Sequence, residues 1–428
     1  AAPAAPADEP AAVARLRALL GPDTALTYRS AETLDPARGS ARLLGVSMDG
    51  RGRRVAMEEL TLDGLRDDGV GEATARAVTV RDGRNNAAVA RLRLAGLSVR
   101  RPPPGAEVRP DMVRLDALRI EGLRMTGASD ATVAEFSVEE YGAGRTGRVS
   151  MSGFDMRVPG SGNRVAAARA AVRGLDLAAA LTALAASEQP PRTPGGTFGL
   201  EVEGVSVRQG ARALGGFGAL RIAAETPLAG PESGTFALRD LRIEAFPGTA
   251  DWLRRLGYDA VMADLTGESR FDGAAGRLEL GSVSLAVREM GAIGLSMVLD
   301  GVSQRSAARR SADFEAARLV SATLRYVDQS LYARYVRQQA RESRVPEEQV
   351  RRQHADTAEM MLGSFGQGAA GMDAVRAAVA RFLRGEAREV EVTARPREPL
   401  PLGEMRGKPG EPPDAAVLDR LGLEAATR

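Results

Sequence analysis

One phrase, repeated along the chain, constrains the fold more than any other feature of the sequence. At residues 118–125 it reads apolar-x-apolar-x-Gly-apolar-x-apolar, with Gly122 in the glycine position. Composition alone predicts roughly two full matches by chance, whereas the sequence contains seven. The other full matches surround Gly45, Gly96, Gly153, Gly174, Gly204 and Gly294; Gly64 and Gly301 lack only the last apolar residue, and looser copies place Asp240 or Ser282 in the glycine position.

The phrase makes a specific demand on the backbone. Leu118 and Ile120 alternate with charged residues, which predicts the apolar face of a half-buried strand. Simple alternation would place Leu123 and Met125 on the opposite face. A glycine at this change of phase indicates a β-bulge, which returns both residues to the original face and bends the strand. The alternative is a turn that ends the strand, with Leu123 and Met125 beginning the next one.

Both interpretations predict a mainly β protein with some helix, of the α+β class. We expect an elongated, curved antiparallel sheet of repeated strand pairs, followed by a C-terminal helical region. Successive phrases are about 20–30 residues apart, which is enough chain for one up-and-down pair of strands. Aromatic residues make up only 4% of the chain, so the core must be built from Leu, Val, Ala and Met. Such a core suits a sheet with one apolar face.

The patterns also predict individual elements. Strands are expected at residues 25–34, 41–48, 55–65, 74–80, 89–99, 112–125, 132–139, 148–158, 261–271, 277–287, 292–302, 320–326 and 389–394. Helices are expected at residues 11–20, 176–187 with Asp176 as N-cap, near 249–256, after Asp328, from Pro346 to about 362, at 372–383 and near 415–421. Residues 102–105 and 189–196 are rich in proline and glycine and predict loops.

This organisation divides the chain into five segments. They are a flexible tether and short helix (1–22), a first β-repeat region (23–188), a second (189–302), a mixed strand and helical region (303–400) and a proline-rich tail (401–428).

Composition restricts the compartment and the partners. The net charge is +2, and no basic run contains interleaved aromatic residues, so nucleic-acid binding is not expected. The chain has no cysteine and begins with an Ala/Pro-rich stretch, as expected after signal-peptide cleavage in a periplasmic or otherwise exported bacterial protein. No stretch reaches the roughly 18 apolar residues of a membrane span.

The sequence offers few candidates for catalysis, and we expect no enzyme, cofactor or metal site. His354 is the only histidine, and its polar neighbours predict an exposed helix face. The run Gly142-Ala-Gly144-Arg-Thr-Gly147 resembles a dinucleotide fingerprint, but a strand pattern follows where a helix is required, so a loop between strands is expected. The pairs Asp67-Asp68 and Glu139-Glu140 predict solvated edges or turns.

The apolar stripe of the repeats is the remaining candidate site. An ordinary half-exposed sheet would explain it. The alternative is an apolar face that is open to acyl chains, with arginines near its rim. The possible lipid-facing residues are Leu94, Leu97, Ile120, Leu123, Met125, Met151 and Phe154.

The strand-Gly-strand repeats of residues 41–302 resemble bacterial envelope proteins of the AsmA/TamB-like type. They are also similar to exported proteobacterial proteins that combine such strands with a helical C-terminal region. Within the chain, residues 256–301, 319–340, Phe382-Leu383 and 396–399 are the more family-specific parts. The AsmA-like resemblance implies a long β groove and lipid handling between membranes. We therefore expect a non-enzymatic envelope protein that binds or shuttles a lipid or another amphiphile, with a structural or adaptor protein that contacts envelope partners as the alternative.

Overall fold

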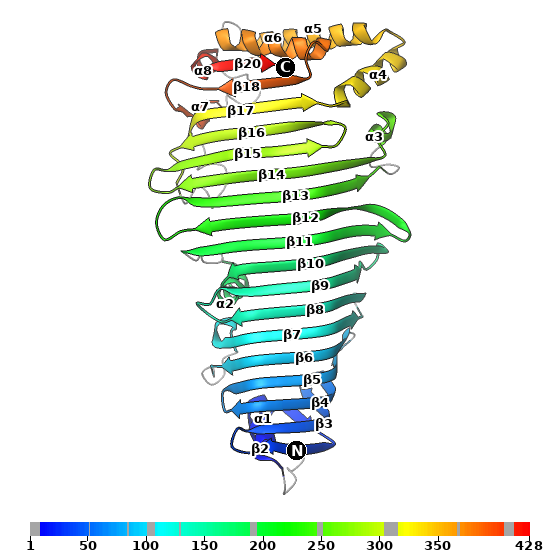
Figure 1. Cartoon of the computed structure of the whole chain (residues 1–428), viewed down its shortest axis with the longest axis vertical. Coiled ribbons are helices and arrows are strands. Elements are labelled where there is room, and N and C mark those ends of the chain that lie inside the picture. Colours follow the sequence, from blue (N-terminus) through cyan, green and yellow to red (C-terminus); the bar gives the residue numbers. More distant parts are fainter. Residues whose placement is uncertain are drawn as a thin grey trace. The chain divides into compact units, whose positions relative to one another are not determined.

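The computed structural model describes residues 9–50, 52–83, 85–100, 108–127, 130–188, 195–245, 251–303, 316–365, 369–405 and 415–428. The chain divides into two compact units, residues 1–213 (unit 1) and 214–428 (unit 2). Antiparallel strands dominate both, and the longest helices belong to unit 2 (Figure 1). The predicted mainly β fold with C-terminal helices is confirmed at this level.

Unit 1 is an antiparallel sheet in which the strands from β3 to β11 follow one another in chain order (Figure 1). Strands β1 and β2 both pair with β3. The elements are α1 (Ala11–Leu20), β1 (Thr24–Thr27), β2 (Ser30–Asp35), β3 (Ser40–Gly50), β4 (Arg53–Arg66), β5 (Gly69–Asp82), β6 (Asn85–Val99), the 3-10 turn η1 (Pro110–Met112), β7 (Val113–Thr126), β8 (Asp130–Tyr141), β9 (Gly147–Arg157), β10 (Asn163–Leu175), α2 (Leu177–Ala185) and β11 (Gly196–Gln209).

Most predicted elements of unit 1 are confirmed. Helix α1 has the predicted bounds, and Asp176 caps α2 by accepting a hydrogen bond of 2.8 Å from the Ala179 amide. The single strand predicted at 25–34 is wrong, because the chain breaks at Tyr28-Arg29 and both halves pair with β3. Strand β10 was not among the predicted strands. The proline loop at 102–105 and most of the linker at 189–196 lie outside the described residues.

The glycine of the repeated phrase lies inside a continuous strand. Strand β7 continues through Gly122, so a strand-ending turn there is wrong. Ile120 and Leu123 both pack against the same apolar cluster, which confirms that the chain returns to its original face after the glycine. The pairing of β6 with β7 keeps one register on both sides of Gly122, because β6 changes phase at the same level. The phase change is therefore shared between neighbouring strands and is not one extra residue in a single strand.

These phase changes line up across the sheet as a first row. The register places Gly122 level with Ala90, and a β carbon built on Gly122 would lie 3.0 Å from the β carbon of Ala90. Gly122 has a φ of 65°, in the left-handed region where a side chain is disfavoured. The residues of the first row, from β3 to β11, are Gly45, Glu58, Ala77, Ala90, Gly122, Ala134, Gly153, Ala168 and Gly204.

A second row crosses the sheet nearer to the other strand ends. Left-handed residues occupy the first row on odd-numbered strands and the second row on even-numbered strands. Among the described residues each strand from β3 to β11 has one of them: Gly45, Gly64, Ala77, Gly96, Gly122, Glu140, Gly153, Gly174 and Gly204. The repeating element is therefore one strand and not the predicted strand pair; Ala77 and Glu140 hid the copies in β5 and β8.

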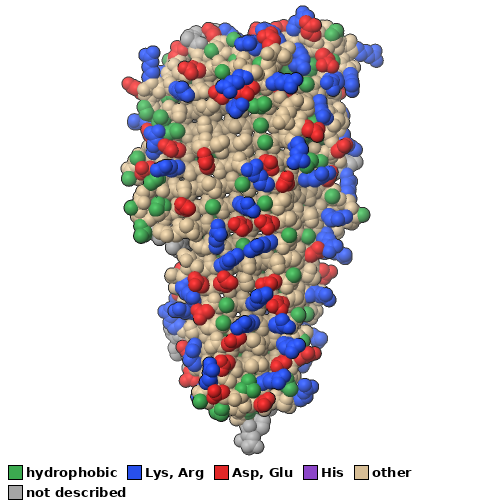
Figure 2. All heavy atoms as spheres, viewed as in Figure 1, with side chains coloured by type: hydrophobic (Ala, Val, Ile, Leu, Met, Phe, Trp, Pro, Cys, Tyr) green, Lys and Arg blue, Asp and Glu red, His purple; other side chains and the backbone are tan. Residues whose placement is uncertain are grey.

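The apolar face of unit 1 is covered at one end. Helix α1 packs against β1, β3 and β4, and its Val13 is fully buried. Beneath it Leu43 is 0% exposed and Leu60 is 6% exposed. The opposite face carries interleaved basic and acidic side chains (Figure 2). One of its cross-strand ion pairs joins Arg93 and Glu72 at 2.9 Å.

Unit 2 combines antiparallel strands with helices. Its elements are β12 (Arg212–Thr226, from Leu214 onward), β13 (Glu232–Glu244), α3 (Asp251–Arg255), β14 (Ala260–Asp272), β15 (Arg277–Val287), β16 (Gly291–Asp300), β17 (Arg318–Asp328), α4 (Leu331–Ser343), α5 (Glu347–Phe365), α6 (Ala370–Arg384), β18 (Glu389–Ala394), β19 (Leu400–Pro401), α7 (Leu402–Met405), α8 (Ala415–Arg420) and β20 (Leu423–Thr427). Strands β12 to β18 pair in chain order, and β20 pairs with β18.

The phrase behaves differently in unit 2. Asp240 is left-handed, with a φ of 52°, and the register of β13 against β14 shifts there. Gly294, by contrast, is not left-handed, and a β carbon on it would meet nothing within 4 Å. The predicted meander of β14, β15 and β16 is confirmed. In the tail, the short helix predicted near 415–421 is present as α8, and β20, which was not among the predicted strands, extends the sheet after it.

Helices α4, α5 and α6 of unit 2 lie next to its last strands (Figure 1). Helix α6 packs against β18 and β20, with the Phe382 ring 5.6 Å from the Tyr326 ring of β17. The carboxylate of Asp328 accepts a hydrogen bond of 2.9 Å from the Tyr332 amide in the first turn of α4, as the sequence predicts. No helix in the described part of the chain is long and apolar enough to cross a membrane.

Candidate functional site

The predicted lipid-facing residues lie on one apolar face of unit 1. Leu94 and Leu97 belong to β6, Met151 and Phe154 to β9. Ile120, Leu123 and Met125 belong to β7, which lies between β6 and β8.

Strand β8 completes this face, although none of its residues was among the predicted lipid-facing residues. The register joins Leu92, Ile120, Phe136 and Met151 into one transverse row of directly opposed side chains. The same row continues to Ala170 and Val202 on β10 and β11. The strand itself was predicted at 132–139, but Val133, Phe136 and Val138 were not assigned to the face, because the change of phase in β8 falls at Ala134 instead of at a glycine. Large side chains opposed in this way form a continuous apolar surface.

Burial falls along this face, away from α1. On β3, β4 and β5 the apolar side chains are buried, but from β6 onward most are only half-buried. Leu94, Leu97, Ile120, Leu123, Met151 and Phe154 are all half-buried, and Met125 is 38% exposed. Large apolar side chains left in this state over several adjacent strands are a recognised mark of a binding surface.

The arginines of the repeats lie on the opposite face. Arg91 pairs with Glu121 at 3.1 Å, and Arg119 pairs with Glu135 at 3.1 Å on the neighbouring strand. These exposed pairs contribute little to stability, but they neutralise the charge of the face. They do not form a free basic rim beside the apolar residues.

Unit 2 has its own exposed apolar cluster, which the sequence analysis did not single out. Leu285 opposes Ile293, and Leu295 opposes Leu324, on the adjacent strands β15, β16 and β17. These four side chains are between 36% and 51% exposed. We call them the unit 2 apolar cluster. Their signal in the sequence is ordinary strand alternation, which does not distinguish a covered face from an open one.

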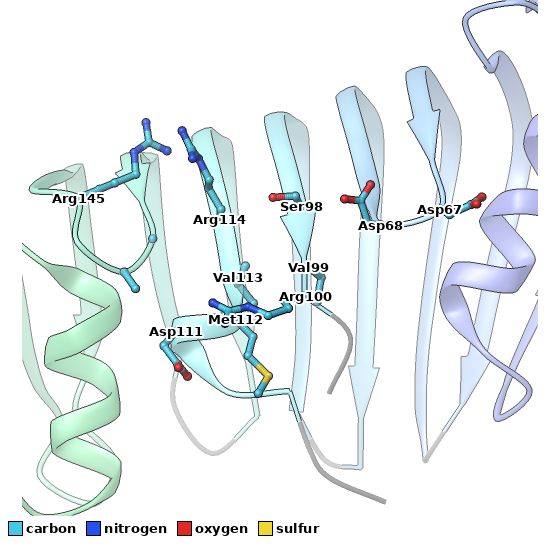
Figure 3. A pocket seen from close by; sticks show the side chains of 12 residues that line it. Asp67, Asp68, Ser98, Val99, Arg100, Asp111, Met112, Val113, Arg114 and Arg145 are labelled. Carbon is cyan, nitrogen blue, oxygen red and sulfur yellow. The ribbon is translucent and has the colours of Figure 1, made fainter. Parts of the chain in front are cut away.

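A pocket of about 640 Å³ opens at one strand-end edge of unit 1 (Figure 3). The turn between β4 and β5 supplies Asp67 and Asp68, η1 supplies Asp111, and the ends of β6 and β7 supply Arg100 and Arg114. Three arginines, including Arg145 after β8, thus stand among three carboxylates.

The basic and acidic side chains of this pocket are equal in number and are not separated into two sides. The guanidinium groups of Arg114 and Arg145 extend in the same direction, away from Asp111 and Met112 (Figure 3). Arg145 is held by Asp116 at 2.9 Å. Burial raises the pKa of Tyr141, whose hydroxyl donates to the Pro110 carbonyl at 3.1 Å. This mixed lining favours neither an anion nor a cation.

The turn formed by Gly142 and Gly144 joins β8 to β9, as the sequence predicts. The Gly144 amide donates to the Asp176 carboxylate at 2.7 Å, so it is used within the fold. Asp67 and Asp68 form the turn between β4 and β5, as expected. No group of three or more His, Cys, Asp or Glu side chains that could hold a metal ion is found among the described residues.

His354 is not on an exposed helix face, so that prediction is wrong. It is half-buried between α4 and α5, with Nδ1 3.2 Å from the Tyr332 hydroxyl and Nε2 2.7 Å from Oε1 of Gln339. Burial, and then the charge of Arg351, lower the pKa of His354. The sequence around His354 is polar, which suggested an exposed face. Its partners belong to α4, so the local sequence of α5 does not show them.

Comparison with known proteins gives a match to part of the chain. A family model described as "Uncharacterized protein" matches residues 284–428, from within β15 to the C-terminal strand. A search of curated proteins finds no match. The matched part contains α4, α5 and α6 and all four residues of the unit 2 apolar cluster.

Proposed function

We propose that this protein binds a lipid or another amphiphile on the apolar face of unit 1, at strands β6 to β11. The observation that carries the proposal is the fall in burial along one continuous face. Leu60 is 6% exposed beneath α1, whereas Met125, three strands away, is 38% exposed. A face built only as a core would be covered along its whole length, because exposed apolar area costs about 25 cal/mol per Å².

The shape of this surface suits an acyl chain. Opposed side chains such as Ile120, Phe136 and Met151 make an apolar track that runs across the strands. A flexible hydrocarbon chain can lie along such a track without forming directed hydrogen bonds. The unit 2 apolar cluster offers a second surface of the same chemistry.

The proposed role is non-enzymatic and belongs to the bacterial envelope. The only histidine, His354, is engaged by Tyr332 and Gln339 within the helices, and the chain has no cysteine. A cysteine-free chain is compatible with an oxidising, exported setting.

The alternative is an adaptor that docks envelope proteins on the same apolar surfaces. The unit 2 apolar cluster favours it, because four adjacent, exposed aliphatic side chains on neighbouring strands also suit a protein interface. The two functions differ in what occupies the surface.

The test begins with protein purified from a bacterial envelope. Native mass spectrometry and solvent extraction should show bound acyl species, and an apolar fluorescent probe should be displaced by fatty acid or phospholipid. Met125→Glu should weaken this binding about tenfold or more, because it places a charge on the track. Thr132→Glu is the matched control, since Thr132 is exposed on the charged face one strand away.

A purified protein with the bare chain mass, and a probe that neither binds nor responds to Met125→Glu, would rule out the lipid proposal. Recovery of a stoichiometric protein partner that Met125→Glu or Leu324→Glu releases would establish the adaptor instead.

A further inference from the structure

The end of α3 and one face of α4 line an open cavity whose chemistry differs from that of the apolar faces. Its volume is about 440 Å³, and it lies within unit 2. The lining residues are Arg255, Leu256, Gly257, Arg334, Arg337, Gln338, Arg341 and Glu342. Four of these eight side chains are arginines and one is acidic.

The helical repeat of α4 gathers the arginines. Arg334, Arg337 and Arg341 occur at intervals of three and four residues, so they lie on one face of the helix. Val336 and Ala340 lie on the buried face of the same helix. The sequence pattern therefore fixes which side of α4 is basic, and the end of α3 adds Arg255.

Arg334 lines the cavity, but its guanidinium group is already bound by neighbouring residues. Its guanidinium donates to the Gly257 carbonyl at 2.6 Å and lies 4.1 Å from the centre of the Tyr258 ring. These contacts join the C-terminal end of α3 to α4, where the last carbonyls of a helix attract a cation.

The other arginines are largely uncompensated. Arg255 and Arg341 form no ion pair with any residue in the described ranges, and Arg337 reaches Glu347 only at 3.6 Å. The one acidic residue of the lining, Glu342, accepts a hydrogen bond of 2.9 Å from Gln338. An open cavity with two unpaired guanidinium groups, and a third in a long ion pair, attracts an anion, and planar guanidinium groups match phosphate oxygens in pairs.

We propose that this cavity binds a phosphate group, through Arg255, Arg337 and Arg341. The group is either the head group of an anionic lipid or a soluble phosphate ester. Trp252, one helical turn before Arg255, is 51% exposed and is the only tryptophan of the chain. An exposed indole beside basic side chains suits the interfacial region of a membrane, which favours the lipid source. The site is independent of the apolar face of unit 1.

Trp252 also provides the measurement. Its fluorescence is followed during titration with inorganic phosphate, with glycerol 3-phosphate, and with phosphatidylcholine vesicles that contain or lack phosphatidic acid. Isothermal titration calorimetry runs in parallel, so that binding is detected even if the indole does not respond. A blue shift only with phosphatidic acid identifies the lipid head group, and saturable binding of glycerol 3-phosphate without vesicle binding identifies a soluble ester.

Variants decide whether the cavity is responsible. Arg255→Gln and Arg341→Gln should each weaken binding about tenfold. The affinity of Arg341→Lys should lie between that of the native chain and that of Arg341→Gln, because lysine keeps the charge but lacks the planar guanidinium group. The control is Arg352→Gln, which removes the same charge from an exposed pair with Glu348 on α5 and should change binding less than twofold.

The proposal is overturned if none of these phosphate probes binds, or if Arg352→Gln weakens binding as much as Arg341→Gln does. Circular dichroism confirms that each variant is folded, and Arg341→Lys retains the test if a glutamine variant is not. Because Met125→Glu in unit 1 should leave phosphate binding unchanged, the failure of either proposal is visible without the other.

Discussion

A β carbon built on Gly153 would lie 2.6 Å from the β carbon of Ala134 on the adjacent strand. Gly153 is also left-handed, with a φ of 61°. Two physical reasons therefore require glycine here, a backbone conformation that side chains disfavour and a neighbour that leaves no room. Gly204 stands in the same relation to Ala168, at 2.8 Å, so the requirement belongs to the row and not to one strand.

Gly153→Ala should destabilise unit 1 by about 1–3 kcal/mol, from the strained backbone and the contact with Ala134 together. Urea unfolding followed by circular dichroism measures the change. Adding Ala134→Gly should restore the part due to the contact and leave the part due to φ. Gly294→Ala is the control: the same phrase surrounds it, but it is not left-handed and its β carbon would meet nothing within 4 Å. A cost for Gly294→Ala equal to that for Gly153→Ala would contradict this account.

Val13→Asp should detach α1 and uncover the buried end of the apolar face. Val13 is 0% exposed, so an unpaired carboxylate there should cost about 3 kcal/mol or more. Anilinonaphthalene sulfonate fluorescence should rise as the surface around Leu43 and Leu60 is exposed. Ala14→Asp, on the exposed side of the same turn, should change neither stability nor dye binding appreciably; equal effects from both substitutions would show that α1 does not act as a cover.

The helices of unit 2 should lose stability as the pH falls through the range in which histidine side chains become protonated. Burial and Arg351 hold the pKa of His354 below its usual 6.5, so the unfolded chain takes up the proton first. The contribution of neutral His354 is therefore complete above about pH 6.5 and is lost on acidification. Thermal unfolding of the native chain and of His354→Gln between about pH 8 and pH 5 isolates this term. Identical slopes in both proteins would contradict it.

Tyr332 should resist ionisation until the solution is strongly alkaline. Burial, opposed in part by Arg351, raises its pKa to about 12. Its contribution to stability is thus complete below about pH 10 and is lost as the pH rises through 12. In a spectroscopic tyrosinate titration Tyr332→Phe should lower the amplitude of the late phase by one tyrosine, and Tyr326, whose pKa burial also raises, should remain in it. Tyr335→Phe, which alters a tyrosine that is 43% exposed, should leave the late phase in place. Loss of an early step in Tyr332→Phe would contradict the assignment.

The sequence predicted most strands of unit 1 because they alternate for many residues, and most of them change phase at a glycine. It missed the copies in β5 and β8, because Ala77 and Glu140 adopt there a conformation that glycine usually marks. The sequence identified the apolar residues of the stripe, but it could not predict how far each of them is exposed to solvent. Covering depends on α1, which is far from Met125 in the chain.

The arginine cavity was out of reach for a related reason. The spacing of Arg334, Arg337 and Arg341 is visible in the sequence, but charged residues at such spacing normally form a solvated helix face. Only the approach of Arg255, about 80 positions earlier in the sequence, turns this face into a cavity. Likewise His354 appeared polar and exposed because its partners Tyr332 and Gln339 belong to another helix.

The alternation of left-handed residues between two rows has a consequence for how such a chain can change in length. Adding or removing two consecutive strands of unit 1 keeps the direction of every later strand, the row in which its left-handed residue falls and the face that its leucines and valines occupy. Adding one strand would reverse the direction of all that follow and place two left-handed residues side by side in one row. Growth of this sheet by duplication is therefore expected to proceed in steps of two strands, with the width of the apolar track unchanged and its length set by the number of copies.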